Sequence, residues 1–284
     1  MATREILLDV GGSFVKCSDG RSVPINSNGS REEIASALRA AMGDASGAGV
    51  AIPGPFDYDN GVFLMKHKFA AVYGESFADL VKPGANFRFI HDVNAMLLGE
   101  MSAGRGADYQ RVALVTLGTG LGFSMCIDSV ILCDESGAPR VSIYNLPYGD
   151  GVLEDYASKR GIVAAYGLES GAPAVNLTAK KIAGKAFAGD DAANLAFLRV
   201  GRILAGSVAP ILDEYGIECL LFGGQISRSF ELFRPSLEDA FRDLKSLRYF
   251  GPVSDIDQAT FNGLRTLQAK TQLLPQTISK QVLI

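Results

Sequence analysis

The chain has 284 residues, of which 48% are hydrophobic and 20% are charged, and its formal net charge is -4. This composition is typical of a folded globular protein and excludes wholesale disorder. Lys and Arg are scattered along the chain, so charge gives no basis for binding nucleic acid or an anionic membrane. We therefore expect neither as a partner.

The N-terminal sequence MATREILLDV lacks the basic and apolar regions of a signal peptide, and no apolar run approaches the roughly 20 residues that span a bilayer. We expect a cytoplasmic protein. Its four cysteines form no CxxC pair and fit neither a disulfide framework nor a zinc site. We expect them to be small buried side chains: Cys17, Cys126, Cys133 and Cys219.

The first part of the chain is predicted to alternate short apolar strands with helices. Ile34, Leu38 and Met42 recur at helical spacing. The expected elements are a strand over 5–10, a turn at Gly11-Gly12, a short strand over 14–17, a helix over 31–42, a strand over 50–52 before the turn Pro53-Gly54-Pro55, a strand over 87–91 and a helix over 93–103.

The second part begins with another apolar strand and is then mostly helical. Pro210 is expected to kink or interrupt the helix that contains it, because proline lacks an N–H donor. The expected elements are a strand over 112–117, the turn Gly118-Thr119-Gly120, a strand over 123–127, helices beyond residue 152 including one over 191–215, a strand over 218–222 ending in Gly223-Gly224, and a helix over 258–270.

Two segments share one plan of apolar strand, glycine turn and apolar strand: ILLDVGGSFVKC and ALVTLGTGLGFSMC. They begin roughly a hundred residues apart, which indicates a duplicated α/β unit with a cleft between the copies. We place the boundary near residue 114, giving lobes over 1–114 and 115–284. The last helix is left free to pack back on the N-terminal lobe.

The glycine turns are candidates for binding phosphate, because a backbone without side chains can approach an oxyanion and point N–H groups at it. Each turn taken singly is more typical of a tight hairpin, but three such turns after apolar strands favour a common role. No GxxxxGK[ST] sequence is present, and GTGLG at 118–122 fails the GxGxxG pattern. A P-loop and a Rossmann dinucleotide site are therefore not expected.

Six motifs together resemble the ROK-family sugar kinases in order and spacing. They are DVGGSFVK (9–16), AIPGPFDYDNG (51–61), HDVNAMLLGE (91–100), TLGTGLG (116–122), LEDYASKRGI (153–162) and LLFGGQIS (220–227). The resemblance implies the two-lobed actin-like (ribonuclease H-like) ATPase fold, with duplicated α/β domains and a central cleft. It also implies phosphoryl transfer from ATP, with Mg²⁺, to a hydroxyl of a hexose or hexose derivative. A small-molecule sugar is the implied partner, and a homodimer is left open.

The resemblance also assigns roles to residues of the motifs. Asp9 would hold Mg²⁺, largely through water, and Gly11, Gly12 and Ser13 would lie near the transferred phosphate. The remaining nucleotide contacts would come from two turns. The β and γ phosphates would be bound by Gly118, Thr119 and Gly120, and the adenosine would lie against Gly223 and Gly224. The residues implied to contact the sugar are Gly54, His91, Asp92, Glu135 and Glu154.

Asp92 is the candidate general base. It follows an apolar strand and precedes a helix, so it should lie at the carboxyl end of the strand, where α/β clefts open. A carboxylate there can take the proton from a sugar hydroxyl as its oxygen attacks the γ-phosphorus. The alternative is helix capping, for which Asp is also favoured.

Three departures from the family pattern bear on metal and substrate. The family's cysteine-rich zinc motif is replaced by NLPYGDGVLE, with Asn145, Pro147 and Val152 at the expected cysteine positions, so we expect no zinc site. The family's Glu-x-Gly-His motif is matched only by Glu135-Ser136-Gly137, with Ala138 in place of the histidine. His91 replaces the usual asparagine, either as a cap of the strand end or as a contact that alters sugar specificity.

Two other functions remain open at this stage. The first is a non-catalytic sugar- or nucleotide-binding sensor, since some relatives are transcriptional regulators. Those regulators carry an N-terminal winged helix, and the first phosphate motif begins here at residue 9, so we expect no DNA-binding domain. The second is a kinase that uses polyphosphate as its donor.

Overall fold

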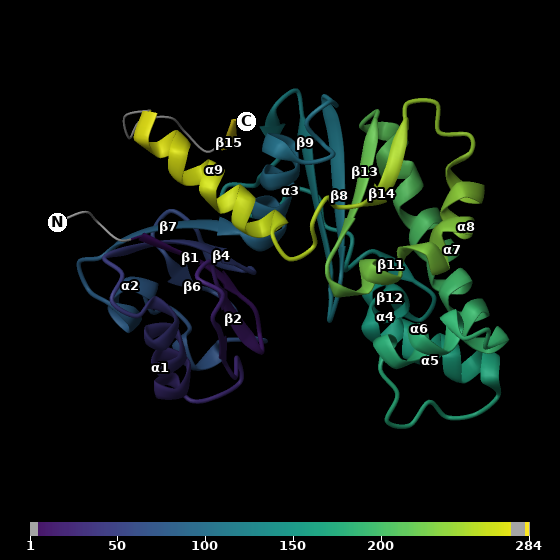
Figure 1. Ribbon diagram of the computed structural model, residues 1–284, viewed down its shortest axis with the longest axis horizontal. Helices are drawn as coiled ribbons and strands as arrows, with labels where there is room; N and C mark the ends of the chain where they lie inside the picture. The colour runs from purple at the N-terminus through teal and green to yellow at the C-terminus, as the bar shows by residue number, and fades with distance from the viewer. Residues whose placement is uncertain (1–4, 274–281, 284) are drawn as a thin grey trace. The chain divides into compact units, whose positions relative to one another are not determined.

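The computed structural model describes residues 5–273 and 282–283 and divides the chain into two compact α/β units (Figure 1). Unit 1 comprises the chain up to Gly104, together with Val130–Arg140 and the residues from Asp257 onward. Unit 2 comprises Arg105–Ser129 and Val141–Ile256. Each unit therefore contains segments that are distant in sequence, unlike the single division near residue 114 that the sequence suggests.

Unit 1 is built on a five-stranded sheet in the order β3-β2-β1-β4-β7. β2 runs antiparallel to β1, whereas β4 is parallel to both β1 and β7. The strands are β1 (Glu5–Val10), β2 (Phe14–Cys17), β3 (Ser22–Pro24), β4 (Gly47–Ile52) and β7 (Asn86–His91).

Unit 2 repeats this plan in the order β14-β13-β8-β9. β9 is antiparallel to β8, and β13 is parallel to both β8 and β14. β9-β8-β13-β14 therefore has the same strand directions as β2-β1-β4-β7, which confirms the predicted duplication. The strands are β8 (Arg111–Leu117), β9 (Leu121–Ile127), β13 (Cys219–Gly223) and β14 (Tyr249–Pro252).

Short strands extend the loops of both units. They pair as antiparallel ladders, each only two residues long. The pairs are β5 (Phe56–Asp57) with β6 (Val62–Phe63), β10 (Val130–Ile131) with β15 (Val282–Leu283), and β11 (Pro147–Tyr148) with β12 (Gly151–Val152).

Helices cover both faces of the sheet of unit 1 (Figure 1). α1 contacts the sheet at β1, β2 and β3, while α9 contacts β1 and β4 and packs against α3. Gly47–Ile52 is buried along its whole length, since small and aliphatic residues fit between two helical layers. The helices are α1 (Arg31–Met42), the 3-10 turn η1 (Ala70–Val72), α2 (Phe77–Val81), α3 (Asp92–Ala103) and α9 (Ala259–Leu273).

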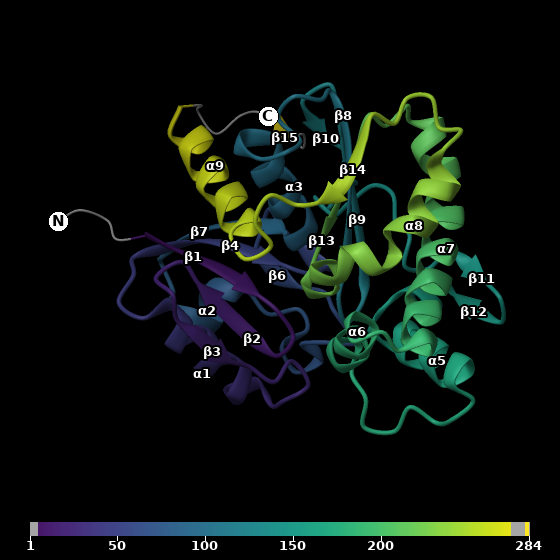
Figure 2. The same cartoon turned by 45° about the vertical axis from the view of Figure 1, so that its right-hand side comes forward.

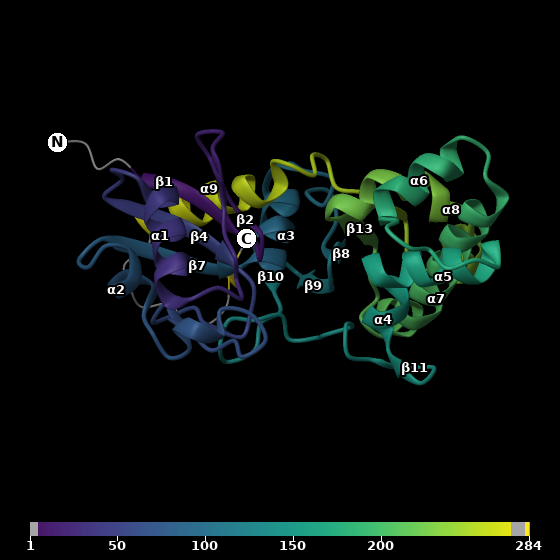
Figure 3. The same ribbon diagram turned by 90° about the horizontal axis from the view of Figure 1, so that it is seen from below.

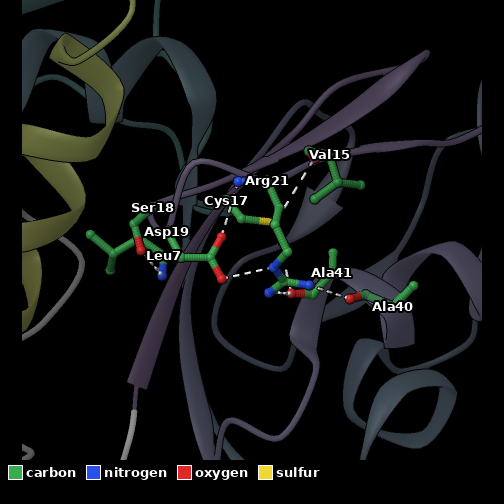
Figure 4. Close-up of polar contacts among 8 residues, drawn as sticks. All are labelled: Leu7, Val15, Cys17, Ser18, Asp19, Arg21, Ala40 and Ala41. Atoms are coloured by element: carbon green, nitrogen blue, oxygen red, sulfur yellow. Dashed lines mark hydrogen bonds and ion pairs between the residues drawn. The ribbon is translucent and has the colours of Figure 1, made fainter.

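Both ends of α1 are closed by side-chain hydrogen bonds. Ser30 and Glu33 form a capping box at its start. At its end, the Arg21 guanidinium donates to the carbonyls of Ala40 and Ala41 at 2.7 and 2.9 Å and pairs with Asp19 at 2.8 Å (Figure 4). Arg21 thus satisfies carbonyls that a helix end leaves without partners, and it ties the β2–β3 hairpin to α1.

The helices of unit 2 pack mainly on one another. α7 contacts α5, α6 and α8, and α5 also contacts α4 and α6 (Figures 2 and 3). The helices are α4 (Leu153–Ala157), α5 (Lys159–Ser170), α6 (Ala179–Phe187), α7 (Asp191–Glu214), the 3-10 turn η2 (Gln225–Ser229) and α8 (Phe230–Phe241).

α7 runs as one helix with Pro210 inside it, so the predicted interruption is wrong. Proline removes one hydrogen bond from a helix interior, and here the extensive packing of α7 on its neighbours holds the helix together. Among the residues that the structure describes, α7 alone has the length and apolar composition of a membrane span. Its buried residues, which include Phe197, Leu204 and Leu212, give that composition a role in the core of unit 2.

The crossing of α3 and α9 depends on two glycines. A Cβ on Gly99 would collide with the carbonyl of Ala259, and a Cβ on Gly263 would collide with the carbonyl of Ala95. The two backbones are therefore in direct contact, and any side chain at either position must separate the helices.

We predict that Gly99→Val lowers the free energy of unfolding by about 1–3 kcal/mol or more, as overpacking does. The matched control is Gly184→Ala in α6, where a Cβ meets nothing within 4 Å; an exposed helical glycine gains about 0.8–1.0 kcal/mol on this change. Denaturant unfolding measures both. Unchanged stability in Gly99→Val would contradict the close α3–α9 contact.

Candidate functional site

The sheet register brings the sequence-predicted residues of unit 1 to one edge. Asp9 on β1 pairs with Ala51 on β4, and the next residue of β4, Ile52, pairs with His91 on β7. Since the three strands are parallel, their carboxyl ends lie together. Three features consequently share this edge: Asp9, Asp92, and the turn that contains Gly54.

Asp9 is a largely enclosed carboxylate with one cationic neighbour. Its side chain is 24% exposed, and the nearest cation is the Lys16 ammonium at 3.9 Å. Burial raises the pKa of Asp9 to about 6, opposed by the charge of Lys16 and reinforced by that of Asp92. A carboxylate whose charge is poorly compensated is suited to a further cation.

The turn after β1 keeps its backbone close to neighbouring chain. The Gly11 N–H donates to the carbonyl of Phe14 at 2.9 Å, and a Cβ on Gly12 would lie 3.3 Å from Oγ of Ser27. The side chain of Ser13 is exposed. The turn is thus a tight hairpin, as one alternative predicted, and it also borders the edge that carries Asp9 and Asp92.

Asp92 begins α3 and is bound by its two chain neighbours. Its Oδ1 accepts a hydrogen bond from the Val93 N–H at 2.8 Å and lies 2.9 Å from Nδ1 of His91. The Val93 N–H also donates to that nitrogen, at 3.3 Å. Oδ1 is held from two sides, while Oδ2 has no hydrogen bond within the described part of the chain.

These contacts set the protonation state of Asp92. Burial raises the pKa of its carboxyl, but His91, the Val93 N–H and the charge of Lys68 outweigh burial and hold the pKa below its usual value of 3.8. Asp92 is therefore ionised at neutral pH, as a proton acceptor must be. Asp92 and His91 both act at the start of α3, so the capping interpretation is compatible with the geometry.

Gly54 lies against two aromatic side chains. A Cβ there would be 3.3 Å from the Tyr58 hydroxyl and 3.5 Å from the His91 ring. The Tyr58 hydroxyl donates to the carbonyl of Ile52 at 3.0 Å, and its ring centroid is 5.9 Å from that of His91. Tyr58 escaped the sequence analysis because nothing in its position along the chain signals this contact.

Glu135 lies on a short hairpin of unit 1 that the side chain of Asn94 holds. Asn94 Nδ2 donates to the carbonyl of Gly137 at 3.1 Å and to Sγ of Cys133 at 3.4 Å. Cys133 is only partly buried, which corrects the expectation that all four cysteines are buried; burial still raises the pKa of its thiol to about 11. The Glu135 side chain is exposed and has no hydrogen bond or ion pair among the described residues.

In unit 2 the side chain of Glu154 binds the turn after β8. Its carboxylate accepts the Leu121 N–H at 2.9 Å and pairs with Arg160 at 3.1 Å. A Cβ on Gly120 would lie 2.5 Å from that carboxylate. Glu154, implied by the family resemblance to bind sugar, here stabilises the Gly118-Thr119-Gly120 turn.

The turn itself is open at its tip. The Gly118 N–H donates to the carbonyl of Gly120 at 3.1 Å, and the Gly118 carbonyl accepts the Lys159 N–H at 3.1 Å. Thr119 is exposed, and a Cβ on Gly118 would meet only the carbonyl of Gly120, at 3.9 Å. Space beside Gly118 is available for a ligand.

Gly223 and Gly224 have a structural role that the sequence did not reveal. Gly223 is the last residue of β13 and pairs with Thr116 of β8. Gly224 has φ +79°, and a Cβ there would collide with the backbone of Leu117. Only glycine suits this position, whether or not adenosine binds nearby.

Side chains of α4 hold the hairpin β11–β12, which lies in the segment where no zinc motif is expected. The Tyr156 hydroxyl donates to Asp150, and Oδ2 of Asp155 accepts the Val152 N–H at 3.0 Å. The Tyr148 and Tyr156 ring centroids are 5.0 Å apart. No group of three or more His, Cys, Asp or Glu side chains that could hold a metal occurs among residues 5–273 and 282–283.

The comparisons with known proteins agree with this architecture. A family model described as "ROK family" matches residues 24–138 and 149–264, which is most of the chain. The chain belongs to the ROK family. The match spans the edge with Asp92 in unit 1 and the glycine turn in unit 2, and it ends within α9.

Two curated relatives are similar in sequence. The glucokinase of Thermotoga maritima is 29% identical over 220 residues, which cover 69% of each chain. An uncharacterized protein of Clostridium perfringens is 27% identical over 152 residues, 54% of this chain and 51% of that protein. The chain thus matches about half the length of one relative and two thirds of the other.

Solved structures of ROK proteins share the fold. A ROK glucokinase from Streptomyces griseus, in complex with glucose and AMPPNP, is 21% identical with a TM-score of 0.78 and covers 93% of this chain and 98% of its own. A ROK transcriptional regulator, a homolog of the E. coli MLC protein, is 20% identical with a TM-score of 0.73, covering 93% and 78%. The expected two-domain actin-like fold is confirmed.

We predict that Gly118→Val weakens ATP binding while the protein stays folded, because the branched side chain fills the space beside the turn and its Cβ makes only an ordinary contact, at 3.9 Å, with the carbonyl of Gly120. Loss of a backbone N–H bond to a charged acceptor costs about 1.5–3 kcal/mol, or roughly 10–100-fold in affinity. Calorimetry measures the affinity, with Gly206→Ala in α7 as control, since a Cβ there meets nothing within 4 Å. Unchanged affinity in folded Gly118→Val would exclude this turn as a phosphate site.

We predict that His91→Asn raises the pKa of Asp92, because it removes the charge and shifts the hydrogen bond that hold this pKa below its usual value. With the ionised carboxylate less stabilised, Asp92 binds its proton at higher pH, so its pKa rises. NMR titration of the Asp92 side-chain carbon measures the change, and Asp92→Asn assigns the resonance. An equal or lower pKa in His91→Asn would show that His91 does not stabilise the ionised carboxylate.

Proposed function

We propose that this protein is an ATP-dependent sugar kinase that transfers the γ-phosphoryl group to a hydroxyl of a hexose or hexose derivative. The observation that carries the proposal is the ionised carboxylate of Asp92, with Oδ2 unbonded, on the sheet edge that also carries Asp9 and the Gly11-Gly12 turn. Membership of the ROK family and the similarity to a glucokinase support it.

In this proposal the sugar hydroxyl donates a hydrogen bond to Oδ2 of Asp92 before transfer. As the hydroxyl oxygen forms its bond to the γ-phosphorus, the bond from phosphorus to the ADP oxygen breaks and ADP leaves with the electron pair. The hydroxyl proton passes to Asp92. His91 and the Val93 N–H fix Oδ1, which restricts rotation of the carboxylate and presents Oδ2 to the acceptor.

Asp9 is the residue that would hold Mg²⁺. Its carboxylate is enclosed and has its pKa raised to about 6 by burial, so a divalent cation would relieve a poorly compensated charge. A single carboxylate fits Mg²⁺, which keeps several waters and is bound largely through substrate phosphates. When bound, the ion neutralises charge on the phosphates during transfer.

The glycine turns and the sugar contacts complete the proposal. Gly11, Gly12 and Ser13 bind the phosphoryl group in transfer, and Gly118, Thr119 and Gly120 bind the β and γ phosphates. Gly54, His91 and Tyr58, which lie against one another, are the candidates for contact with the acceptor sugar. Glu135 and Glu154 are the weaker candidates for sugar contact, because one is exposed and the other braces a turn.

We predict that Asp92→Asn lowers kcat by about 10²–10⁴-fold, the range for general-base catalysis, with ATP and sugar affinities much less affected. Asn is nearly isosteric and caps a helix about as well as Asp, so the melting temperature should be unchanged. Phosphoryl transfer is measured on a panel of hexoses and N-acetylhexosamines with Mg-ATP, and with polyphosphate in a parallel series.

The outcomes separate the competing functions. Full activity in folded Asp92→Asn would exclude Asp92 as the base and leave it a helix cap. Tight sugar or nucleotide binding without turnover in the wild type would instead identify a sensor. Transfer from polyphosphate but not from ATP would identify polyphosphate as the phosphoryl donor and leave the proposed chemistry at the sugar hydroxyl unchanged.

A further inference from the structure

One lysine of unit 1 lies beside the proposed transfer site and has no role in the function described so far. Lys68 is half-buried, and its Cδ lies 4.0 Å from the position that a Cβ on Gly12 would take. Its positive charge also acts on Asp92, whose pKa it helps to lower. Lys68 is thus close both to the first glycine turn and to the proposed base.

The backbone fixes Lys68 beside that turn. The Ser27 N–H donates to the carbonyl of Gly12 at 3.1 Å, and the Phe69 N–H donates to the carbonyl of Ser27 at 2.6 Å. Ser27 is buried, so this two-step bridge from the turn to the residue after Lys68 is shielded from water. The segment around Lys68 is therefore attached directly to the Gly11-Gly12 turn.

Phe69 shows that this attachment is enforced by packing. It is a non-glycine residue with φ +54°, in the left-handed region that costs free energy for a bulky side chain. Its ring is fully buried and lies 5.5 Å from that of Phe63. The aromatic core of unit 1 thus holds the backbone at Phe69 in a strained conformation. This fixes the position of the neighbouring backbone of Lys68.

The ammonium of Lys68 has no hydrogen bond or ion pair within the described residues. Lys16, the other lysine near this edge, differs because it pairs with Asp9. Lys66, two residues before Lys68, is exposed and has its ammonium 5.2 Å from the centre of the Tyr73 ring. Lys68 is accordingly a half-buried cation beside the Gly11-Gly12 turn, and its charge acts on Asp92.

We propose that Lys68 binds a non-bridging oxygen of the phosphoryl group during its transfer. This proposal rests on the function proposed above and adds a residue to its machinery. Negative charge on those oxygens must be balanced where phosphorus lies between donor and acceptor, and a lysine ammonium is a strong point-charge partner for phosphate. Lys68 stays protonated throughout, since Asp92 takes the proton.

The first test compares Lys68→Met and Lys68→Arg with Lys66→Met as the matched control. Lys68→Met should lower kcat by about 10²–10³-fold, the effect of removing one donor to a developing oxyanion, with little change in the KM for the sugar. Lys68→Arg should recover part of the rate because it keeps the charge, and Lys66→Met should behave as wild type. Melting temperatures confirm that each variant is folded.

A second test needs neither turnover nor a variant. Lysines of the wild-type protein are acetylated at low reagent concentration with and without inorganic tripolyphosphate, and mass spectrometry compares Lys68 with Lys66. Protection of Lys68 alone is the expected result. Equal acetylation of Lys68 in both conditions would overturn the proposal.

The two tests distinguish failure of this proposal from failure of the proposed function. Protection of Lys68 in a protein that transfers no phosphate would support Lys68 as a phosphate ligand and reject the kinase. A full kcat in Lys68→Met, or a raised sugar KM with kcat unchanged, would keep the kinase and reject the phosphoryl contact. In the latter case Lys68 would be a contact for an acidic acceptor.

Discussion

The site in unit 1 depends on the parallel register of three strands. Because Asp9, Ala51 and Ile90 lie in adjacent ladder positions, everything that follows β1, β4 and β7 leaves the sheet at the same edge. A slip of one residue would turn every side chain of the slipped strand to the opposite face of the sheet. The buried residues of β4 and the packing of α1, α3 and α9 keep that register fixed.

Charge is distributed unequally at this edge. Burial disfavours the charged form of both carboxylates. At Asp9 burial dominates and the pKa is raised, whereas at Asp92 other contacts outweigh burial and the pKa is lowered. The difference comes from their neighbours: Asp9 has one lysine ammonium at 3.9 Å, whereas Asp92 has His91 and a backbone N–H at 2.9 and 2.8 Å. One carboxylate therefore suits a cation, and the other suits a proton acceptor.

Several residues that the family pattern marks as ligand contacts also serve the fold of this chain. Glu154 braces the turn at Gly118, and Gly224 is required by the backbone of Leu117. Tyr156 and Asp155 likewise hold the β11–β12 hairpin. Such positions can stay unchanged in sequence for structural reasons alone, so a motif match does not by itself identify a binding residue.

The sequence by itself determined most strands of the two main sheets, the glycine turns, the duplicated plan and Asp92 at a strand end, because these follow from local patterns of apolar residues, glycine and capping. It did not predict β3 or β14. The interruption predicted at Pro210 is wrong because tertiary packing maintains α7 despite a lost hydrogen bond. Tyr58, Asn94 and Lys68 were missed because their contacts join segments far apart in the chain. Only the tertiary structure could bring Lys68 from an irregular loop to the first glycine turn. Its position is set by the buried backbone hydrogen bonds of Ser27 and by aromatic packing at Phe69.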